Sequence, residues 1–496
     1  MSITFSNTIK FSGEASYSPN EKYFAISRSL EFLIYETATL KPIQKHSFCD
    51  YIEKIQWRPD STLILIGLFK RGVVEIKQIG KPEWICRLDD GLIGISSAIF
   101  SPDSRNVLTV SDNNIKMTIW SLTTKTTSYI SFPKFSKKGI SFTSNGNFMA
   151  LALKESTQDE VGIYFLGNWS SIGKFATKTQ DLQDVKWTFD NSSILVIDSL
   201  LVCRLLVYTP LGDLLWQIEP YQYKLGIRNL FLSPNGKFIS LGCYDQSVKV
   251  YNNISYTLIT NFDHTSKTEC FNNNKVNYFK EEGIEGFGGK SKYITINPPV
   301  EVTNKMPHTT DVRPKMGIRK VEYSYDSAFM ATKNDNMPNT LFIWEMMGMN
   351  LHTVIIQLRE ITDFKWSPNY HILFILSGCS NLYYFTLDSI YVAELPVTFT
   401  ANEVIWNKNG RKFILKDPNF MIIGDFYSGE DEEEHQEYQE NYGNINDNQY
   451  EEGNEQNYEE RNEEMVNQNE DEEEGVNEDE EAKIQQFNQM QGTAQI

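Results

Sequence analysis

The residues that could do chemistry in this 496-residue chain are few and scattered. Catalytic and metal sites need His, Cys, Asp or Glu side chains at spacings that bring them to one point. The six histidines are His46, His264, His308, His352, His371 and His435. None is paired with a cysteine or an acid at metal-ligand spacing, and no GxSxG, HExxH, kinase or dinucleotide-binding motif is present. We therefore expect no enzyme, no cofactor and no metal site.

One glycine-rich stretch, at 283–291, has the composition of a phosphate-binding loop and ends in Lys290-Ser291. A P-loop requires the spacing GxxxxGK[ST] directly after a strand. That spacing places a glycine at position 284, where Ile284 stands, and the preceding residues do not predict a strand. We interpret the stretch as a flexible loop.

The cysteines also lack the spacing of a metal or redox site. They contain no CxxC pair and lie mostly in apolar runs, which is typical of buried thiols in a reducing compartment. The N-terminus has no signal-peptide pattern, and the longest apolar runs are too short to cross a bilayer. We expect a soluble intracellular protein. The six cysteines are Cys49, Cys86, Cys203, Cys243, Cys270 and Cys379.

The elements that must position any site are short strands of a repeated unit, clearest at 226–252. Residues 230–232 are apolar, a Ser-Pro-Asn-Gly turn follows, and 238–243 is a short apolar strand. Asp245 then begins a second turn before the alternating stretch 248–251. We predict that Asp245 caps this turn through backbone N–H groups and is not catalytic.

Nine copies of this unit are recognised by an anchor residue followed by a turn and an apolar strand. Successive anchors lie 40, 43, 42, 45, 45, 91, 43 and 40 residues apart, which matches the blade period of a WD40 propeller. We predict an all-β protein: one closed ring of about nine degenerate blades. The alternatives are a hidden tenth unit, two smaller propellers or an open ring. The anchors are Tyr17, Trp57, Phe100, Phe142, Trp187, Leu232, Tyr323, Trp366 and Trp406.

The ends of the repeat array predict how the ring closes. The ninth unit stops near Tyr427, one strand short, and residues 3–11 supply a spare strand before the first unit. Pairing that N-terminal strand into the last blade removes two sheet edges. The propeller is therefore expected over 1–428, with a loop insertion at about 263–313 where the spacing doubles.

The remaining segment, 429–496, is rich in Glu, Asn and Gln and is expected to be disordered. Residues 430–496 hold 24 acids and 2 bases, which leaves 41 acids and 44 bases in residues 1–429. The near-neutral body without a basic stripe argues against nucleic acid as the main ligand. Within the tail, Ile484, Phe487 and Met490 form a weak candidate for a short docking helix.

Some loop residues are more specific than turn chemistry requires, and we consider them candidate partner-binding positions. The 331–339 loop has a second interpretation, as a hydrogen-bonded loop that supports the neighbouring blade. Exposed aromatic residues such as Trp84 are the expected binding anchors. The candidates are Lys70, Arg71, Trp84, Gln180, Asp181, Asn334, Asp335, Asn336 and Pro338.

Three segments carry a family resemblance: YKLGI at 223–227, PKMGI at 314–318 and NDNMPNTLFIWE at 334–345. With these motifs in order over about residues 1–427, the chain resembles the WD-repeat-containing protein 8 family of centrosomal WD-repeat proteins. The insertion and the tail lie outside the resemblance.

The resemblance implies a non-catalytic scaffold in the cytoplasm and cytoskeleton, at centrosomes, basal bodies or spindle poles. It implies a coiled-coil anchoring partner, with a minus-end-directed kinesin as a second candidate, and roles in microtubule minus-end anchoring, spindle organisation and cilium assembly. The alternatives from other classes are a propeller of a translation or ribosome-assembly complex, and a hydrolytic or redox site where acids or histidines converge at the channel rim.

Overall fold

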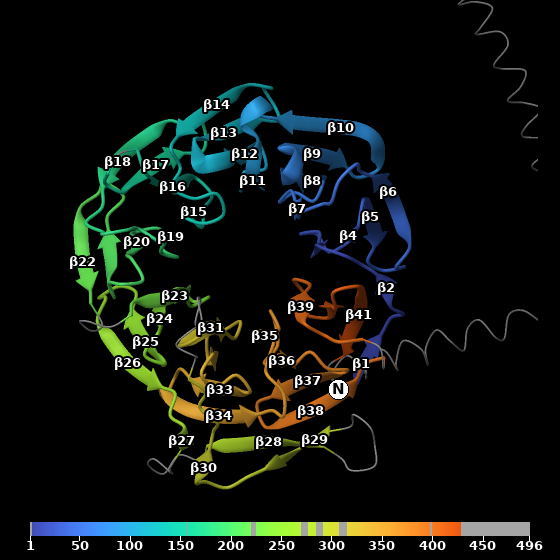
Figure 1. The fold of residues 1–496 in the computed structure, drawn as a ribbon, viewed down its shortest axis with the longest axis vertical. Helices are drawn as coiled ribbons and strands as arrows, with labels where there is room; N and C mark the ends of the chain where they lie inside the picture. The colour runs from blue at the N-terminus through green and yellow to red at the C-terminus, as the bar shows by residue number, and fades with distance from the viewer. Residues whose placement is uncertain are drawn as a thin grey trace, which may run out of the picture. The chain divides into compact units, whose positions relative to one another are not determined.

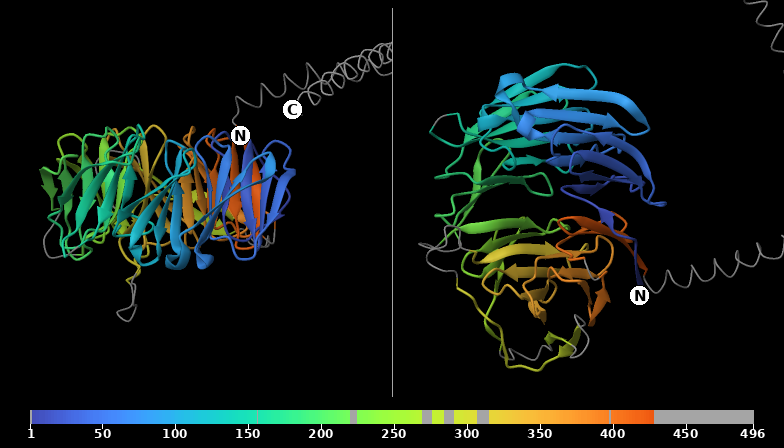
Figure 2. Two further views of the ribbon diagram at one scale, coloured as in Figure 1. Left: turned by 90° about the horizontal axis from the view of Figure 1, so that it is seen from above. Right: turned by 45° about the vertical axis from the view of Figure 1, so that its right-hand side comes forward.

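Nine β-sheets stand around a central opening like the blades of a propeller (Figure 1). The computed structural model describes residues 2–427 apart from 156, 220–224, 269–275, 284–290, 307–314 and 397–398. Within each repeat, successive strands pair antiparallel from the inside of the ring to the outside. The strands therefore run back and forth between the two faces of the ring (Figure 2).

The innermost strand of each blade ends at or near the anchor residue of its repeat. In several of these strands the first and third residues are partly exposed and the second and fourth are buried, as in Lys54–Trp57. This period of two follows from the alternation of side chains across a strand. The innermost strands are β3 (Ala15–Tyr17), β7 (Lys54–Trp57), β11 (Ile95–Phe100), β15 (Ile140–Phe142), β19 (Asp184–Trp187), β23 (Ile227–Leu232), β31 (Ile318–Tyr323), β35 (Asp363–Trp366) and β39 (Glu403–Trp406).

The second strand of each blade is the most apolar, because both of its faces pack against neighbouring blades. Every residue of the second strand of the second blade is buried. The second strands are β4 (Tyr23–Arg28), β8 (Leu63–Leu68), β12 (Asn106–Ser111), β16 (Phe148–Leu153), β20 (Ile194–Ile197), β24 (Phe238–Cys243), β32 (Phe329–Asn334), β36 (Leu373–Leu376) and β40 (Lys412–Lys416).

The third strands are also largely buried, and several carry an aromatic residue at their last position or the one before it, as in Tyr208 and Trp344. They are β5 (Glu31–Glu36), β9 (Val73–Gln78), β13 (Lys116–Ser121), β17 (Glu160–Phe165), β21 (Leu205–Tyr208), β25 (Ser247–Asn252), β33 (Thr340–Glu345), β37 (Asn381–Thr386) and β41 (Phe420–Tyr427).

The outermost strands form the circumference and expose most of their side chains. In the first eight blades they are β6 (Pro42–Ser47), β10 (Lys81–Asp89), β14 (Thr127–Ser131), β18 (Ser171–Ala176), β22 (Leu214–Ile218), β26 (Leu258–Asp263), β34 (Asn350–Ile356) and β38 (Ser389–Glu394). The outermost strand of the ninth blade comes from the other end of the chain.

That strand is β1 (Ser2–Phe5), which lies next to β41, while β2 (Ile9–Lys10) also pairs with β41. The Ser6 N–H group donates a hydrogen bond to the Ile423 carbonyl oxygen over 2.8 Å. The structure confirms the prediction that the N-terminal strand completes the last blade. Figure 1 shows the two ends of the described chain together in this blade.

The core is divided into hydrophobic clusters that lie between neighbouring blades. One of them joins the last blade to the first, since Ile414, Met421 and Ile423 pack with Phe24 and Ile26. Nine clusters of this kind account for the nine interfaces of a closed ring. The described residues therefore form one closed nine-bladed propeller, rather than two smaller propellers or an open ring.

The insertion differs from the sequence prediction, because part of it is β-structure rather than loop. It adds two strands to the edge of the seventh blade, so that β28 (Asn277–Gly283) pairs parallel with β34 and β29 (Ser291–Thr295) pairs antiparallel with β28. The added strands lie outside β34 in Figure 1. Two more short strands, β27 (Lys267–Thr268) and β30 (Val300–Glu301), pair with each other.

A buried carboxylate fastens the insertion to the eighth blade. Glu281 on β28 is 4% exposed and accepts hydrogen bonds from the Tyr383 hydroxyl at 2.6 Å and the Leu358 N–H group at 2.9 Å. Leu358 and Tyr383 lie 77 and 102 residues further along the chain than Glu281, and the edge of β34 is similarly distant from β28. The local sequence pattern could therefore not predict the strand. The loop prediction was wrong here for that reason.

The helical content of the described residues is three short 3₁₀ turns. They are η1 (Phe69–Arg71), η2 (Gly91–Ile93) and η3 (Asp112–Asn114). None of the described segments forms a helix with the length and apolarity to span a membrane. The acidic tail from 429, its candidate docking helix and the glycine-rich residues 284–290 lie outside the described part of the chain.

Candidate protein-interaction surfaces

The loops lie at two ends of the ring, and most of the predicted binding residues lie at one end. Because the strands alternate in direction, loops that lead into an innermost strand share an end with loops that join the second and third strands. We call this end the upper face and the opposite end the lower face. Loops 69–72, 177–183 and 334–339 all belong to the upper face.

Lys70 and Arg71 are exposed on the upper face of the second blade. The Lys70 N–H group donates to Glu53 Oε1 over 2.8 Å, and the Arg71 guanidinium lies 3.4 Å from Asp50 Oδ2. An exposed pair of this kind contributes little to stability, about 0–1 kcal/mol. The two cationic side chains are therefore available to a partner.

Gln180 and Asp181 lie in the loop that leads into the fifth blade. Asp181 Oδ1 lies 2.6 Å from Lys134 Nζ, and the same ammonium group lies 2.8 Å from the buried Asp159. The hydrogen bond from Lys134 holds the pKa of Asp181 below its usual value. The Gln180 side chain is exposed, while its N–H group donates to Asp198. Asp181 thus joins two blades, and Gln180 is the accessible member of the pair.

The 334–338 loop is buried, contrary to the expectation that it binds a partner. Asn334 and Asn336 are 0% exposed, and Asp335 lies 2.7 Å from the Arg228 guanidinium. The Asn334 amide donates to Gln246 Oε1 over 3.0 Å, and the Pro338 carbonyl accepts from the Ile361 N–H group over 2.9 Å.

The Asn336 amide reaches the insertion, since it donates to the Lys305 carbonyl over 3.1 Å. One loop therefore joins the sixth and eighth blades and the insertion to the seventh blade. This is the supporting role that the second interpretation of the sequence predicts.

Asp245 occupies the turn between β24 and β25. Its carboxylate accepts hydrogen bonds from the Ser247 N–H group at 3.1 Å and the Ser247 hydroxyl at 2.6 Å. These are the contacts of a turn-capping aspartate.

The sequence analysis missed a buried hydrogen-bond relay around His264. The Trp344 Nε1–H group donates to Thr332 Oγ1 over 2.9 Å, and Thr332 Oγ1 lies 2.8 Å from His264 Nε2. His264 Nδ1 lies 3.0 Å from the Gln246 carbonyl, so the proton of a neutral imidazole belongs on Nδ1 and Nε2 accepts from Thr332. Burial lowers the pKa of His264 to about 4.

A signal for this relay exists in the sequence. His264 directly follows the sixth outermost strand, where a WD repeat carries its Gly-His, but the insertion separates it from the rest of the seventh unit. A related pair stands in the third blade, where the Trp120 Nε1–H group donates to Thr109 Oγ1 over 2.8 Å.

Trp84 lies apart from these loops, on the outermost strand of the second blade. It is 39% exposed and its neighbour Ile85 is 54% exposed. Both line a groove of about 370 Å³ between the second and third blades, together with Trp120 and Leu122. Tryptophan is enriched among residues that dominate protein interfaces, so this groove is a candidate anchor site.

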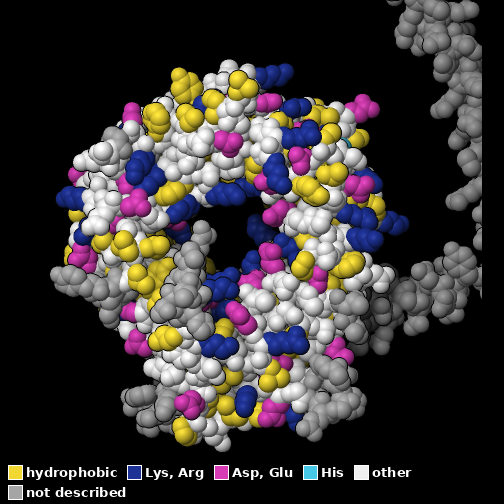
Figure 3. Space-filling model, viewed as in Figure 1, with side chains coloured by type: hydrophobic (Ala, Val, Ile, Leu, Met, Phe, Trp, Pro, Cys, Tyr) yellow, Lys and Arg dark blue, Asp and Glu magenta, His cyan; other side chains and the backbone are white. Residues whose placement is uncertain are grey.

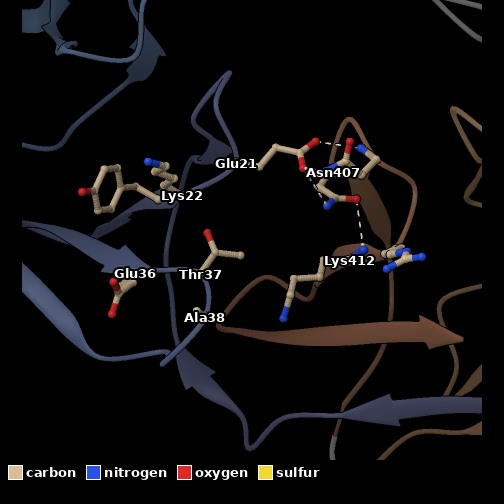
Figure 4. Close-up of a pocket in the computed structure, with 10 residues that line it drawn as sticks. Glu21, Lys22, Glu36, Thr37, Ala38, Asn407 and Lys412 are labelled. Carbon is tan, nitrogen blue, oxygen red and sulfur yellow. Dashed lines mark hydrogen bonds between the residues drawn. The ribbon is translucent and has the colours of Figure 1, made fainter. Parts of the chain in front are cut away.

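A polar pocket of about 310 Å³ lies on the lower face, where the ninth blade meets the first (Figure 4). Glu21 accepts a hydrogen bond from the Asn409 N–H group at 2.7 Å and also contacts the side-chain amides of Asn407 and Asn409. Lys412 on its wall lies 2.9 Å from Asp425. These bonds join the two ends of the ring, so we interpret the pocket as part of the closure.

Comparison with known proteins supports the assignment of the repeats. No family model matches the chain. The mouse (Mus musculus) WD repeat-containing protein WRAP73 is 30% identical over 435 residues, which cover 83% of this chain and 94% of that protein. The chain belongs to the WRAP73 family. This is the family that the sequence motifs predicted under the name WD-repeat-containing protein 8.

An uncharacterized WD repeat-containing protein of Schizosaccharomyces pombe is 22% identical over 361 residues, which cover 69% of this chain and 72% of that protein. Among solved structures, the C-terminal WD40 domain of Sif2 covers 86% of this chain and 99% of that chain, with 10% identity and a TM-score of 0.48.

As a WRAP73-family propeller, the chain is a WD-repeat protein of the kind that acts as a scaffold for protein–protein interaction. In the described part of the chain, no three His, Cys, Asp or Glu side chains are grouped to hold a metal ion. Cys203 and Cys243 are buried as the sequence predicted, whereas Cys49 is exposed.

Proposed function

We propose that this protein is a non-catalytic scaffold at the centrosome, basal body or spindle pole. In this proposal it binds a coiled-coil anchoring protein and acts in microtubule minus-end anchoring, spindle organisation and cilium assembly. A minus-end-directed kinesin is the second candidate partner. The observation that carries the proposal is the 30% identity to WRAP73 over 83% of this chain and 94% of that protein.

The geometry supports a binding role on the second blade. Lys70 and Arg71 present two cations on the upper face, and neither is held by a buried partner. Coiled coils commonly carry glutamates at the positions that flank their apolar seam. Cationic side chains on a rigid propeller face complement such a surface.

The negative charge of the tail favours an indirect contact with microtubules, through a partner protein. Residues 430–496 carry 24 acids and 2 bases, and microtubule surfaces are acidic as well. Like charges repel within a Debye length of about 8–10 Å at physiological ionic strength. We expect the isolated tail to stay in the supernatant when microtubules are sedimented, and a tail that pellets with them would contradict this part of the proposal.

The experiment that tests the proposal is imaging of the tagged full-length chain, combined with proximity labelling, in cells with centrosomes or basal bodies. The expected result is enrichment at these organelles with a coiled-coil anchoring protein among the labelled neighbours. A diffuse signal with ribosomal neighbours would overturn it in favour of a translation or ribosome-assembly scaffold.

A further inference from the structure

A pocket of about 510 Å³ opens along the innermost strands of the second, third and fourth blades. Its walls are mainly apolar and its mouth carries charged and hydroxyl groups. This volume is within the usual range of ligand sites, about 300–1,000 Å³. The apolar walls include Phe69, Ile99, Ile140 and Phe142, and the polar groups include Lys54 and Lys137.

The pocket lies beside the joint between the third and fourth blades, where the described contacts include no lysine bridge of the kind present at three other joints. At three joints a lysine of one innermost strand donates to a backbone carbonyl of the next blade, 44 residues further along the chain. The pairs are Lys54 with Ala98, Lys186 with Leu230, and Lys320 with Phe364.

Between the third and fourth blades, the two positions that could reach across are occupied by Ser97 and Ile99. The Ser97 hydroxyl donates to the Ser136 carbonyl over 2.5 Å, and Ile99 has no polar atom to donate. Ile140 and Phe142 face them from the fourth blade and are only partly buried. Apolar surface is left accessible at positions where the three bridged joints carry a lysine.

The mouth of the pocket is continuous with the upper face of the second blade. Phe69 is the first residue of η1, which also contains Lys70 and Arg71, and Glu53 accepts the Lys70 N–H group. Gly67 leaves room for the Phe69 ring, since a Cβ atom there would lie 2.6 Å from it. A chain bound across Lys70 and Arg71 therefore reaches the pocket directly.

The charged groups at the mouth of the pocket favour a ligand that carries an acidic group next to its apolar part. Lys137 is exposed, and burial together with the nearby Lys137 ammonium group lowers the pKa of Lys54. The Glu14 carboxylate opposes that shift of Lys54, and Glu53 already accepts a hydrogen bond from the Lys70 N–H group. Lysine and arginine side chains also gather around the central opening in the view of Figure 3. Lys137 is thus the cation at this mouth without a carboxylate partner among the described contacts.

We propose that this channel pocket binds a bulky apolar side chain of a partner polypeptide, with an adjacent Asp or Glu of the same polypeptide against Lys137. The inference rests on the proposed scaffold function and deepens it, because it names the chemistry of the partner segment. The apolar side chain contacts Ile99, Ile140 and Phe142, and the segment continues toward Lys70 and Arg71.

The first test uses 8-anilinonaphthalene-1-sulfonate, a dye with an apolar body and an anionic group, on the purified full-length chain. Ile99→Lys fills the pocket in a way that the fold accepts, because Lys186 and Lys365 stand at the equivalent positions of other blades. The matched control is Ile405→Lys, at the equivalent position of the ninth blade and outside the pocket. We expect Ile99→Lys to bind the dye about tenfold more weakly and Ile405→Lys to bind as the wild type does.

Reversing the charge of Lys137 tests, in the same assay, whether the mouth of the pocket binds an anionic group. Lys137→Glu is expected to weaken dye binding about threefold to tenfold, whereas Lys138→Glu, on the neighbouring residue outside the pocket, is expected to leave it unchanged. If all four variants bind the dye equally well, with unchanged circular dichroism and melting temperature, the proposal that this pocket is a binding site is wrong.

The second test places the same variants in cells and measures proximity labelling of the coiled-coil partner. Loss with Ile99→Lys and retention with Ile405→Lys supports the inference. If the wild type localises to the organelle and Ile99→Lys labels the partner equally well, the inference is wrong while the scaffold function stands. If the wild type itself does not localise there, the proposed function fails, and the dye experiment alone still reports whether the pocket binds an apolar anion.

Discussion

The polar loops are buried on one side of the ring and exposed on the other. On the side of blades six to eight, Asp335 pairs with Arg228, Glu281 is buried against Tyr383, and the 334–338 loop has no exposed residue. On the side of blades two to four, Lys70 and Arg71 are exposed, and an apolar pocket faces the channel. A distinctive polar motif can therefore mark the most interconnected part of a propeller rather than its contact surface.

The largest effect is expected from breaking the Arg228–Asp335 pair. Arg228→Met leaves the carboxylate of Asp335, whose side chain is 3% exposed, without its cation. Removing one partner of a buried ion pair costs about 3 kcal/mol. We expect the free energy of unfolding, measured by urea denaturation, to fall by about that amount.

Arg71→Met is the matched control, because its partner Asp50 is on the surface. Its cost is expected to be about 0–1 kcal/mol. Equal losses in the two variants would remove the distinction between the two sides of the ring.

The next largest effect is a loss of folding stability at low pH that is caused by the buried His264. Its pKa is about 4 in the folded chain and about 6.5 when unfolded, so the unfolded state binds the proton more tightly. The stability from burying neutral His264 is complete above pH 6.5 and is lost as the pH falls toward 4. At pH 5 the loss amounts to about 2 kcal/mol relative to pH 7.5.

The measurement is urea unfolding of the wild type and of His264→Gln at both pH values. Carboxylates titrate in both proteins, so the difference between them isolates the histidine. An identical change with pH in the two proteins would show that His264 is not the group responsible.

A smaller effect is expected when the insertion is loosened. Glu281→Gln replaces an acceptor of two hydrogen bonds with an amide that can accept them on one oxygen only, and should cost about 1–2 kcal/mol. Hydrogen exchange of 277–283 should become faster, whereas Glu282→Gln on the same strand should leave it unchanged. Unaltered exchange in Glu281→Gln would mean that β28 does not depend on this carboxylate.

The sequence predicted the ring well because its signals are local. An anchor, a turn and an apolar strand recur within each unit, and the short ninth unit with the spare N-terminal strand indicated how β1 and β41 close the ring. The insertion could not be predicted in this way, since β28 needs the edge of β34, about 75 residues further along the chain.

The candidate sites were predicted less completely. Lys70, Arg71 and Trp84 lie on the surface as a binding role requires, whereas the burial of Asn334 and Asp335 depends on Arg228 and Gln246 in another blade. The channel pocket depends on how Ile99 lies against Ile140 and Phe142 of the next blade, and a contact between blades cannot be read from one repeat alone.

The variant with the smallest expected effect on stability tests the central claim, which is that the binding surface lies on the side of blades two to four. Lys70→Glu combined with Arg71→Glu should lower the unfolding free energy by no more than about 1 kcal/mol, because both side chains are exposed. The control is Lys237→Glu with Lys408→Glu, two exposed lysines in lower-face loops of other blades.

The decisive measurement is the fraction of tagged full-length chain at centrosomes or basal bodies for these two double variants. The account predicts that the Lys70 and Arg71 variant is folded but dispersed, while the lower-face variant stays at the organelle. Retention of the Lys70 and Arg71 variant at the wild-type level would contradict it.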